Sequence, residues 1–429
     1  MDKIKISCAP AGTGSGSNLG MNTVDFAIEN IVKEYKLESR VEINRPWESY
    51  LPNNKGFYPK YKERDFPLRN INYNNFNIIG DQNIPKAIFY WGDFQHGLDY
   101  QVQTAIRLKE ISIKKGWKFD LSEEALIRKS KSYFLLNENF LKKELPYKIA
   151  MYGVTLFQNG LNDYLNNDYF ENLKWLYNEA IFCKTRESYS ANMISYLKKD
   201  YNKSFLGVDC ALLNTKEELT NLPQNKPKEY EKCKENIGIF FGRSTQSLSK
   251  LKLLKFINKL SKKLDKEVIH IPWNYFSGGL LTDNLGIYSN GIKNYHGFKN
   301  VEFTAGDILK GMSEFSLIIT DTYHVVINAI ALNIPVVCVY EPSPLRERDA
   351  NMGYRYAWRD KRALLFQTNN LSDFLINTED LKISKIRNEK IENIVNLMEN
   401  DSLLKMAYTN LHEIAKNDRK TIGQLLINM

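Results

Sequence analysis

Cysteine is scarce in this sequence, and the cysteines that it has form no recognisable framework. The chain of 429 residues has five cysteines, an odd number, and none belongs to a Cys-x-x-Cys pair or to a Cys/His spacing typical of zinc sites. Most of them lie inside apolar runs, which favours reduced, buried thiols. A disulfide scaffold and a zinc module are therefore excluded, and we expect neither a metal nor a cofactor.

Long hydrophobic runs are also missing. No apolar segment reaches the roughly 18 to 20 residues that a membrane-spanning helix needs. The N-terminus, Met1 to Cys8, alternates charged and apolar residues and has no signal-peptide h-region. With 43% apolar and 25% charged residues, the composition is that of a soluble globular protein, which we expect to be cytoplasmic.

The sequence has an excess of basic residues but no basic cluster. Lys and Arg number 59 against 50 Asp and Glu, a net charge of +9, and many of the lysines are pairs scattered along predicted helices. Nucleic-acid binders instead gather basic and aromatic residues on one element. We therefore expect no nucleic-acid partner. Attraction to an anionic substrate, or peripheral association with the inner face of a membrane, stays open.

Strand patterns alternate with helical patterns in both halves of the chain, which indicates parallel sheets with helical crossovers. The polar segment 221–236, with two prolines, is the best linker candidate. We therefore predict an α/β protein with two doubly wound, Rossmann-like domains and an interdomain cleft. The first domain spans 1–222 and the second 236–429, with C-terminal helices that pack back on the first. We expect irregular structure at 40–80, strands at 206–209 and 363–367, and a helical tail from about 371.

The segment TDTYHVVINAIALNIPVV, residues 320–337, places polar groups between a buried strand and a buried helix. The strand is predicted at 316–320 and the helix at 325–332. Asp321 or Thr322 then caps the helix, and His324 lies in its first turn, where free backbone N–H groups favour an anion. A histidine beside a bound anion can give or take a proton near neutral pH. The alternative is that Asp321 only caps the helix and His324 is simply packed or solvated.

Other polar loops follow predicted strands, and ligands bind at the carboxyl ends of strands in such sheets. In the second half, GRSTQS provides Arg243, Ser244 and Thr245, and EPSPLRERD provides Glu341, Arg346 and Arg348 as candidate donor-binding residues. Judged by charge alone, the arginines from Arg346 to Arg362 are instead typical of a solvated basic loop.

The first half offers candidate acceptor-binding residues. In YWGDFQHG, Trp91 and Asp93 suggest a sugar-binding surface, and His96 is a second acid/base candidate unless it is a packed histidine. The glycine-rich loop at 11–20 lets a ligand approach the backbone. Arg186 follows another strand, where it could instead pair with Glu187.

Several of these segments together resemble the polysaccharide pyruvyl transferase family. LIITDTYHVVINAIALNIPVV resembles a family segment in which a strand leads to Arg-Leu-His-Ala, a helix and Gly-Ile-Pro-Val-Val. SNLGMNTVDFAIENIV is similar to its Asn-x-Gly-Asp segment, and CKTRESYS and GVDCALL are similar to two further segments. The resemblance runs from about residue 4 to 345. It adds Asn18 and Gly20 to the acceptor side, and Thr322 and Tyr323 to the donor side in place of Arg-Leu.

The resemblance implies a GT-B-like fold and a transferase of bacterial surface-glycan biosynthesis, active on capsule, exopolysaccharide or lipopolysaccharide. Such enzymes move a pyruvyl group from phosphoenolpyruvate onto a sugar or lipid-linked glycan as a ketal, with His324 as general acid and Asp321 beside it. A GT-B glycosyltransferase with a nucleotide-sugar donor, in which Glu341 holds the ribose, stays an alternative. So does a binding or scaffold subunit without catalysis. The sequence does not indicate an oligomeric state.

Overall fold

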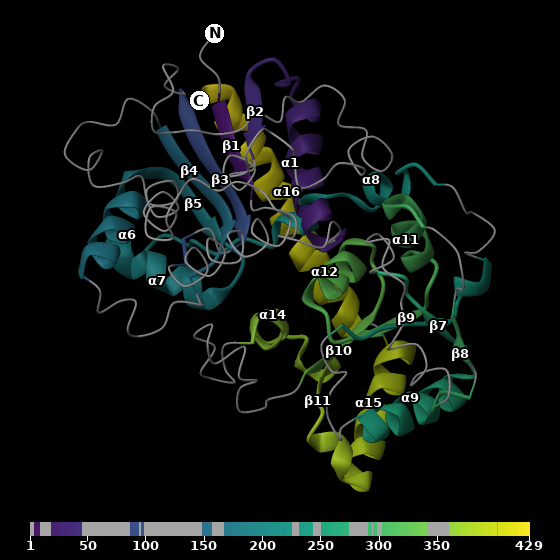
Figure 1. The fold of residues 1–429 in the computed structure, drawn as a ribbon. Coiled ribbons are helices and arrows are strands. Elements are labelled where there is room, and N and C mark those ends of the chain that lie inside the picture. Colours follow the sequence, from purple (N-terminus) through teal and green to yellow (C-terminus); the bar gives the residue numbers. More distant parts are fainter. Residues whose placement is uncertain are drawn as a thin grey trace, which may run out of the picture.

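A computed structural model describes the chain in segments. The described residues are 4–8, 19–44, 86–93, 96–97, 148–156, 167–224, 231–242, 250–273, 291–293, 295–297, 303–340, 360–400 and 402–429. Within them, helices pack around two separate parallel β-sheets (Figure 1).

The first sheet has the strand order β2-β1-β3-β4-β5. Its strands are β1 (Ile4–Cys8), β2 (Val41–Asn44), β3 (Ala87–Asp93), β4 (Lys148–Val154) and β5 (Ala180–Thr185). All of their pairings are parallel. Alternate residues of a strand point to opposite faces of the sheet. Phe89 and Trp91 therefore join the core that contains α1 (Leu19–Glu34), whereas Ile88 and Tyr90 join the core that contains α6 (Asn167–Glu179) and α7 (Ser188–Lys198).

The second sheet has the order β11-β10-β9-β6-β7-β8, again with parallel pairings only. Its strands are β6 (Ile237–Phe240), β7 (Val268–His270), β8 (Tyr295–His296), β9 (Leu317–Thr320), β10 (Val336–Tyr340) and β11 (Leu375–Asn377). The remaining α-helices are α8 (Lys216–Thr220), α9 (Lys250–Leu264), α11 (Ala305–Met312), α12 (Tyr323–Ala331), α14 (Lys361–Thr368), α15 (Ser384–Glu399) and α16 (Ser402–Asn428). Short 3₁₀ helices are η3 (Cys210–Leu213), η7 (Ser372–Phe374) and η8 (Asp380–Lys382).

This topology confirms the predicted α/β class with two parallel, Rossmann-like sheets. Strands up to residue 185 build the first sheet and strands from residue 237 build the second. The predicted division at 222–236 falls between them, although its boundaries and the interdomain cleft stay predictions. Among the described helices, none combines the length and the apolar character needed to cross a membrane.

Several local expectations were wrong. Residues 41–44 form edge strand β2 inside the segment predicted as irregular. At 206–209 the chain makes a single bridge to Thr185 and then turns into η3. Residues 363–367 belong to helix α14, and β11 interrupts the predicted helical tail. Each error concerns a short segment, where tertiary contacts override weak local preference.

The strand and helix predicted around His324 are confirmed as β9 and α12. Every residue of β9 and α12 is buried, which is why both read as continuous apolar runs. Thr322 is the N-cap residue of α12, although its side chain makes no capping hydrogen bond. The helix stops before Asn333, which adopts a left-handed conformation with φ of 61°.

Helix α16 connects the two sheets. It runs from the second sheet toward the first (Figure 1), and its Tyr408 hydroxyl donates to the Ile334 carbonyl at 3.1 Å. Farther along, Asp418 accepts hydrogen bonds from Tyr152 of β4, at 2.8 Å, and from Lys184 of β5, at 2.5 Å. The helix therefore holds the two halves of the chain in a defined relation.

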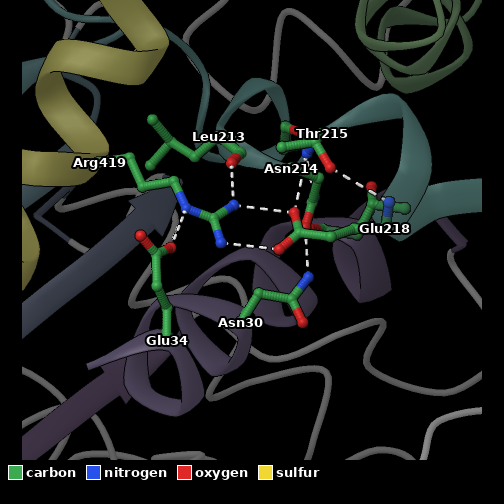
Figure 2. Close-up of polar contacts among 9 residues, drawn as sticks. Asn30, Glu34, Leu213, Asn214, Thr215, Glu218 and Arg419 are labelled. Carbon is green, nitrogen blue, oxygen red and sulfur yellow. Dashed lines mark hydrogen bonds and ion pairs between the residues drawn. The ribbon is translucent and has the colours of Figure 1, made fainter. Parts of the chain in front are cut away.

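Arg419 of α16 forms ion pairs and hydrogen bonds with several partners (Figure 2). Its guanidinium contacts Glu34 of α1 at 2.7 Å and both carboxylate oxygens of Glu218 in α8, at 2.7 and 2.8 Å. It also donates to the carbonyl of Leu213 at 2.8 Å. One side chain thus joins α16 to η3 and to two other helices, and multiple charge-assisted hydrogen bonds are stronger than a single surface ion pair.

Candidate active site

The candidate site lies where residues that follow one sheet meet residues that follow the other. Arg186 comes directly after β5, and Tyr323 and His324 follow β9 at the start of α12. The Arg186 guanidinium lies over the Tyr323 ring, 5.2 Å from its centroid. The structure therefore brings together Arg186, Tyr323 and His324, residues predicted for acceptor binding, donor binding and catalysis.

Asp209 connects these residues electrostatically. Arg186 and Asp209 form a buried ion pair with an N–O distance of 3.0 Å, and both side chains are at most 2% exposed. Asp209 also caps η3 by accepting from the Ala211 amide at 3.0 Å. A buried pair of this kind is stable only while both partners are present.

The charge on Asp209 is set by its neighbours. Burial by itself raises the pKa of the carboxyl, but the positive charges of Arg186 and His324 outweigh burial and leave the pKa below its ordinary value. Burial and Asp209 raise the pKa of the Tyr323 hydroxyl well above its ordinary value, so Tyr323 remains a neutral hydrogen-bond donor to Asp209.

Lys361, at the first position of α14, provides a second cation. Its Nζ atom lies 4.4 Å from the centroid of the Tyr323 ring, and its charge also lowers the pKa of Asp209. The side chain is half-buried. We refer to Arg186, Asp209, Tyr323, His324 and Lys361 as the His324 cluster.

Gly20 of α1 packs directly on His324. A Cβ added to Gly20 would lie 2.1 Å from the His324 Cβ, far closer than two carbon atoms can approach. Beside this contact, Asn328 of α12 donates to the Thr23 hydroxyl at 3.1 Å and to the His324 carbonyl at 2.8 Å. Helix α1 therefore fixes the first turn of α12. The predicted acceptor-side residue Gly20 lies at the site, where its contact is with His324.

Asp321 supports the turn between β9 and α12. Its Oδ1 atom accepts from the Gly242 amide at 2.8 Å and from the Thr322 hydroxyl at 3.0 Å. Asp321 is fully buried. It therefore holds Gly242, just beyond the end of β6, next to the start of α12.

Trp91 and His96, by contrast, are buried beside the first sheet, Trp91 toward α1 and His96 toward α6. The Trp91 indole N–H donates to the Val24 carbonyl at 2.8 Å, and its ring stacks on Tyr152 at 5.6 Å. His96 is fully buried, with its Nδ1 atom 3.0 Å from the Tyr177 hydroxyl, and burial lowers its pKa from 6.5 to about 3. A neutral histidine packed against the α6 side of the sheet cannot donate a proton at neutral pH. Neither residue belongs to the His324 cluster.

Arg186 and Glu187 do not pair with each other, contrary to the simpler interpretation of their sequence. Glu187 instead caps α7 by accepting from the Ser190 amide at 2.8 Å, and it also accepts from Thr155 at 3.0 Å. This frees the Arg186 guanidinium to turn toward Asp209. The buried Glu187 carboxylate therefore caps α7, whereas Arg186 contributes to the candidate site.

Some predicted site residues lie outside the described residues. They are Asn18, Arg243, Ser244, Thr245, Glu341, Arg346 and Arg348, and of Asp93 only the strand position is described. Within the described ranges, no three His, Cys, Asp or Glu side chains gather in a way that could hold a metal ion.

Sequence reasoning missed Asp209, Lys361 and the role of Arg362. Asp209 gave a signal, because it precedes an apolar segment where an acidic residue is typical of a helix cap. The sequence predicts a solvated basic loop around Arg362, but its guanidinium is buried and donates to the Asp321 carbonyl at 2.6 Å. No local pattern distinguishes such an arginine from its exposed neighbours.

Comparison with known proteins identifies the family. The model of the polysaccharide pyruvyl transferase family matches residues 50–343, more than half of the chain. This chain belongs to the polysaccharide pyruvyl transferase family. The match includes Arg186, Asp209, Tyr323 and His324, and Lys361 lies beyond its end. A comparison with curated protein sequences found no match.

Three solved structures are similar to this pyruvyl transferase family member. A UDP-GlcNAc 2-epimerase from Neisseria meningitidis bound to UDP-GlcNAc has 12% identity and a TM-score of 0.48, with 100% of both chains covered. A UDP-GlcNAc 2-epimerase from Methanocaldococcus jannaschii has 12% identity and a TM-score of 0.43, with 91% of this chain and 92% of that chain covered. An α,α-trehalose 6-phosphate synthase from Burkholderia multivorans has 10% identity and a TM-score of 0.42, with 99% and 98% covered. At such TM-scores these likenesses carry no argument about ligands.

Proposed function

We propose that this protein transfers the pyruvyl group of phosphoenolpyruvate to a sugar of a bacterial surface glycan as a ketal. Family membership supports a transferase, and the His324 cluster supports the chemistry. The observation that carries the proposal is the position of His324. It lies at the first turn of α12, beside the Arg186–Asp209 ion pair and near Lys361.

The reaction needs one proton donor and cations around an anionic substrate. In its protonated form, His324 donates a proton to the methylene carbon of phosphoenolpyruvate, and C2 becomes electrophilic. A first sugar hydroxyl adds to C2 and loses its proton, phosphate then leaves with the bridging oxygen, and a second hydroxyl takes its place. The two protons lost from the hydroxyls balance the one gained by the methyl group and the one gained by phosphate. His324 thereby regains its proton.

Ligand-dependent melting temperatures give the first test, because a ligand that binds only the folded state raises the melting temperature. The ligands are phosphoenolpyruvate, UDP, CMP and UDP-GlcNAc. We expect a rise with phosphoenolpyruvate. A rise with UDP- or CMP-linked ligands alone would overturn the proposal in favour of the glycosyltransferase alternative. No rise with any ligand would instead support a scaffold role.

Transfer itself is tested with ¹⁴C-labelled phosphoenolpyruvate and a panel of hexose glycosides and lipid-linked glycans. We expect the substitution His324→Gln to lower the rate of label transfer about 10²- to 10⁴-fold, the usual contribution of a general acid. The melting-temperature rise with phosphoenolpyruvate should persist in this variant. Equal transfer by the variant and the original protein would exclude His324 as the acid.

A further inference from the structure

Lys361 is a cation at the His324 cluster to which neither the family match nor the sequence patterns assign a role. Its Nζ atom lies 4.4 Å from the centroid of the Tyr323 ring, and Tyr323 directly precedes His324. The side chain is half-buried, so it is partly desolvated and still in reach of a ligand. A lysine in this setting is a point charge with several donors, which suits the tetrahedral oxygens of a phosphate group.

The two cations of the cluster are in different situations. The Arg186 guanidinium forms a buried pair with the Asp209 carboxylate at 3.0 Å and is 2% exposed. Lys361 is less buried, and its charge also acts on Asp209 and lowers the pKa of that carboxyl. Of these two cations, Lys361 is therefore the one that an incoming anion reaches from solvent.

The structure also fixes where Lys361 stands. The next residue, Arg362, donates from Nη1 to the carbonyl of Asp321 at 2.6 Å and to that of Val339 at 3.3 Å. Its Nε atom is held by Asp360, the N-cap residue of α14, at 2.9 Å. At the far end of α14, the Thr368 hydroxyl lies 3.2 Å from that of Ser188 in α7. Helix α14 is thus anchored to the β9–α12 turn and to the first domain, which sets the position of Lys361.

We propose that Lys361 binds the phosphate group of the donor and stabilises it as it leaves. This inference rests on the proposed function, which supplies a phosphorylated donor beside His324. The charge on the phosphate oxygens grows as the bond from C2 to the bridging oxygen breaks, so a fixed cation there favours the transition state over the bound donor. The partial exposure of Lys361 also lets the released phosphate exchange with water.

The test compares the original protein with Lys361→Gln and Lys361→Arg by isothermal titration with phosphoenolpyruvate, inorganic phosphate and pyruvate. Lys385→Gln in α15 removes the same charge at an exposed position and is the matched control. We expect Lys361→Gln to weaken binding of phosphoenolpyruvate and of inorganic phosphate about 10- to 100-fold, in the range of a charged hydrogen bond. Binding of pyruvate should change little, and Lys361→Arg should retain most of the affinity for phosphate.

Each outcome has one meaning. Unchanged binding of phosphate and phosphoenolpyruvate by Lys361→Gln would overturn the inference and leave the proposed function standing. Loss of pyruvate binding with phosphate binding retained would also overturn it, because Lys361 would then hold the carboxylate. If the original protein bound neither phosphoenolpyruvate nor phosphate, the proposed function and the inference would fail together. The melting temperatures without ligand show whether the variants are folded.

Discussion

Gly20 and His324, more than 300 residues apart in the chain, are in direct contact, and a Cβ on Gly20 would lie 2.1 Å from the Cβ of His324. The atom that it would meet is not the flexible end of a side chain. It is attached to the backbone of α12, whose position is further fixed by the hydrogen bond from Asn328 to Thr23. The fit between α1 and α12 therefore depends on the absence of a side chain at position 20.

The substitution Gly20→Ala tests this contact. It should force α1 and α12 apart, lower the free energy of unfolding by roughly 1–3 kcal/mol as other overpacked cores do, and displace His324. Urea denaturation measures the stability, and the transfer assay measures the loss of activity.

A double variant with His324→Gly removes the opposing Cβ and provides the control. If the clash is the cause, the cost of Gly20→Ala should be much smaller in the background of His324→Gly, a non-additivity expected only for residues in contact. Additive costs in the two backgrounds would contradict the steric explanation.

The ion pair between Arg186 and Asp209 should make an acid-sensitive contribution to stability. Asp209→Asn leaves the buried Arg186 charge without its partner, and removal of one member of a buried pair costs about 3–5 kcal/mol. The pKa of Asp209 lies below its ordinary value of 3.8 in the folded protein. The contribution of the carboxylate is therefore fully present above the unfolded-state pKa and is lost as the pH falls below it.

Urea denaturation of the original protein and of Asp209→Asn checks this from pH 7 to pH 3. The difference in unfolding free energy between the two proteins should stay constant down to about pH 5 and shrink below about pH 4. A difference that does not change with pH would show that Asp209 does not act through its charge. Asp373, in the 3₁₀ helix η7, has an exposed side chain, and Asp373→Asn serves as the control.

The parts of the site that lie within one continuous segment were predictable from the sequence. The apolar runs on both sides of residues 321–324 predict strand β9 and helix α12, and the polar residues between them mark the carboxyl end of the sheet. The contact between Arg186 and Tyr323 was not predictable, since it joins two segments that meet only after both sheets have formed. The burial of Trp91 was not predictable either. An aromatic residue at the end of a strand suggests an exposed binding surface, but the carbonyl that accepts from the Trp91 indole N–H belongs to a helix distant in the sequence.

Arg419 should hold α16 against α1, η3 and α8. Arg419→Gln removes its hydrogen bonds to Glu34, Glu218 and the Leu213 carbonyl (Figure 2), and its side chain is only 13% exposed. We expect a loss of about 1–3 kcal/mol in unfolding free energy, less than for a fully buried pair because Glu34 is about half exposed. Hydrogen exchange should also become faster in the last turns of α16.

Lys420→Gln, one residue farther along α16, removes the same charge at an exposed position and should change the stability by less than about 0.5 kcal/mol. Glu218→Gln should reproduce part of the Arg419→Gln loss, and the double variant should lose less than the sum of the two. Equal effects at positions 419 and 420 would mean that only the net charge of α16 matters.

His96 should make the stability of the protein decrease in acid. Burial lowers its pKa to about 3 in the folded protein, whereas in the unfolded chain the ordinary value is 6.5. The unfolded state therefore binds a proton that the folded state does not, and the stability that neutral His96 provides is complete above about pH 6.5 and is lost as the pH falls toward 3. One such group gives a slope of about 1.4 kcal/mol per pH unit.

His96→Asn should reduce the slope between pH 6 and pH 4 by about this amount, as measured by urea denaturation. The substitution also costs packing against Tyr90 and Tyr177 at every pH. Buried His270, whose pKa burial lowers to about 4, remains in the variant and contributes the same slope to it as to the original protein. An undiminished slope in His96→Asn would show that His96 takes up its proton in the folded state, and would reopen its assignment as an acid/base residue.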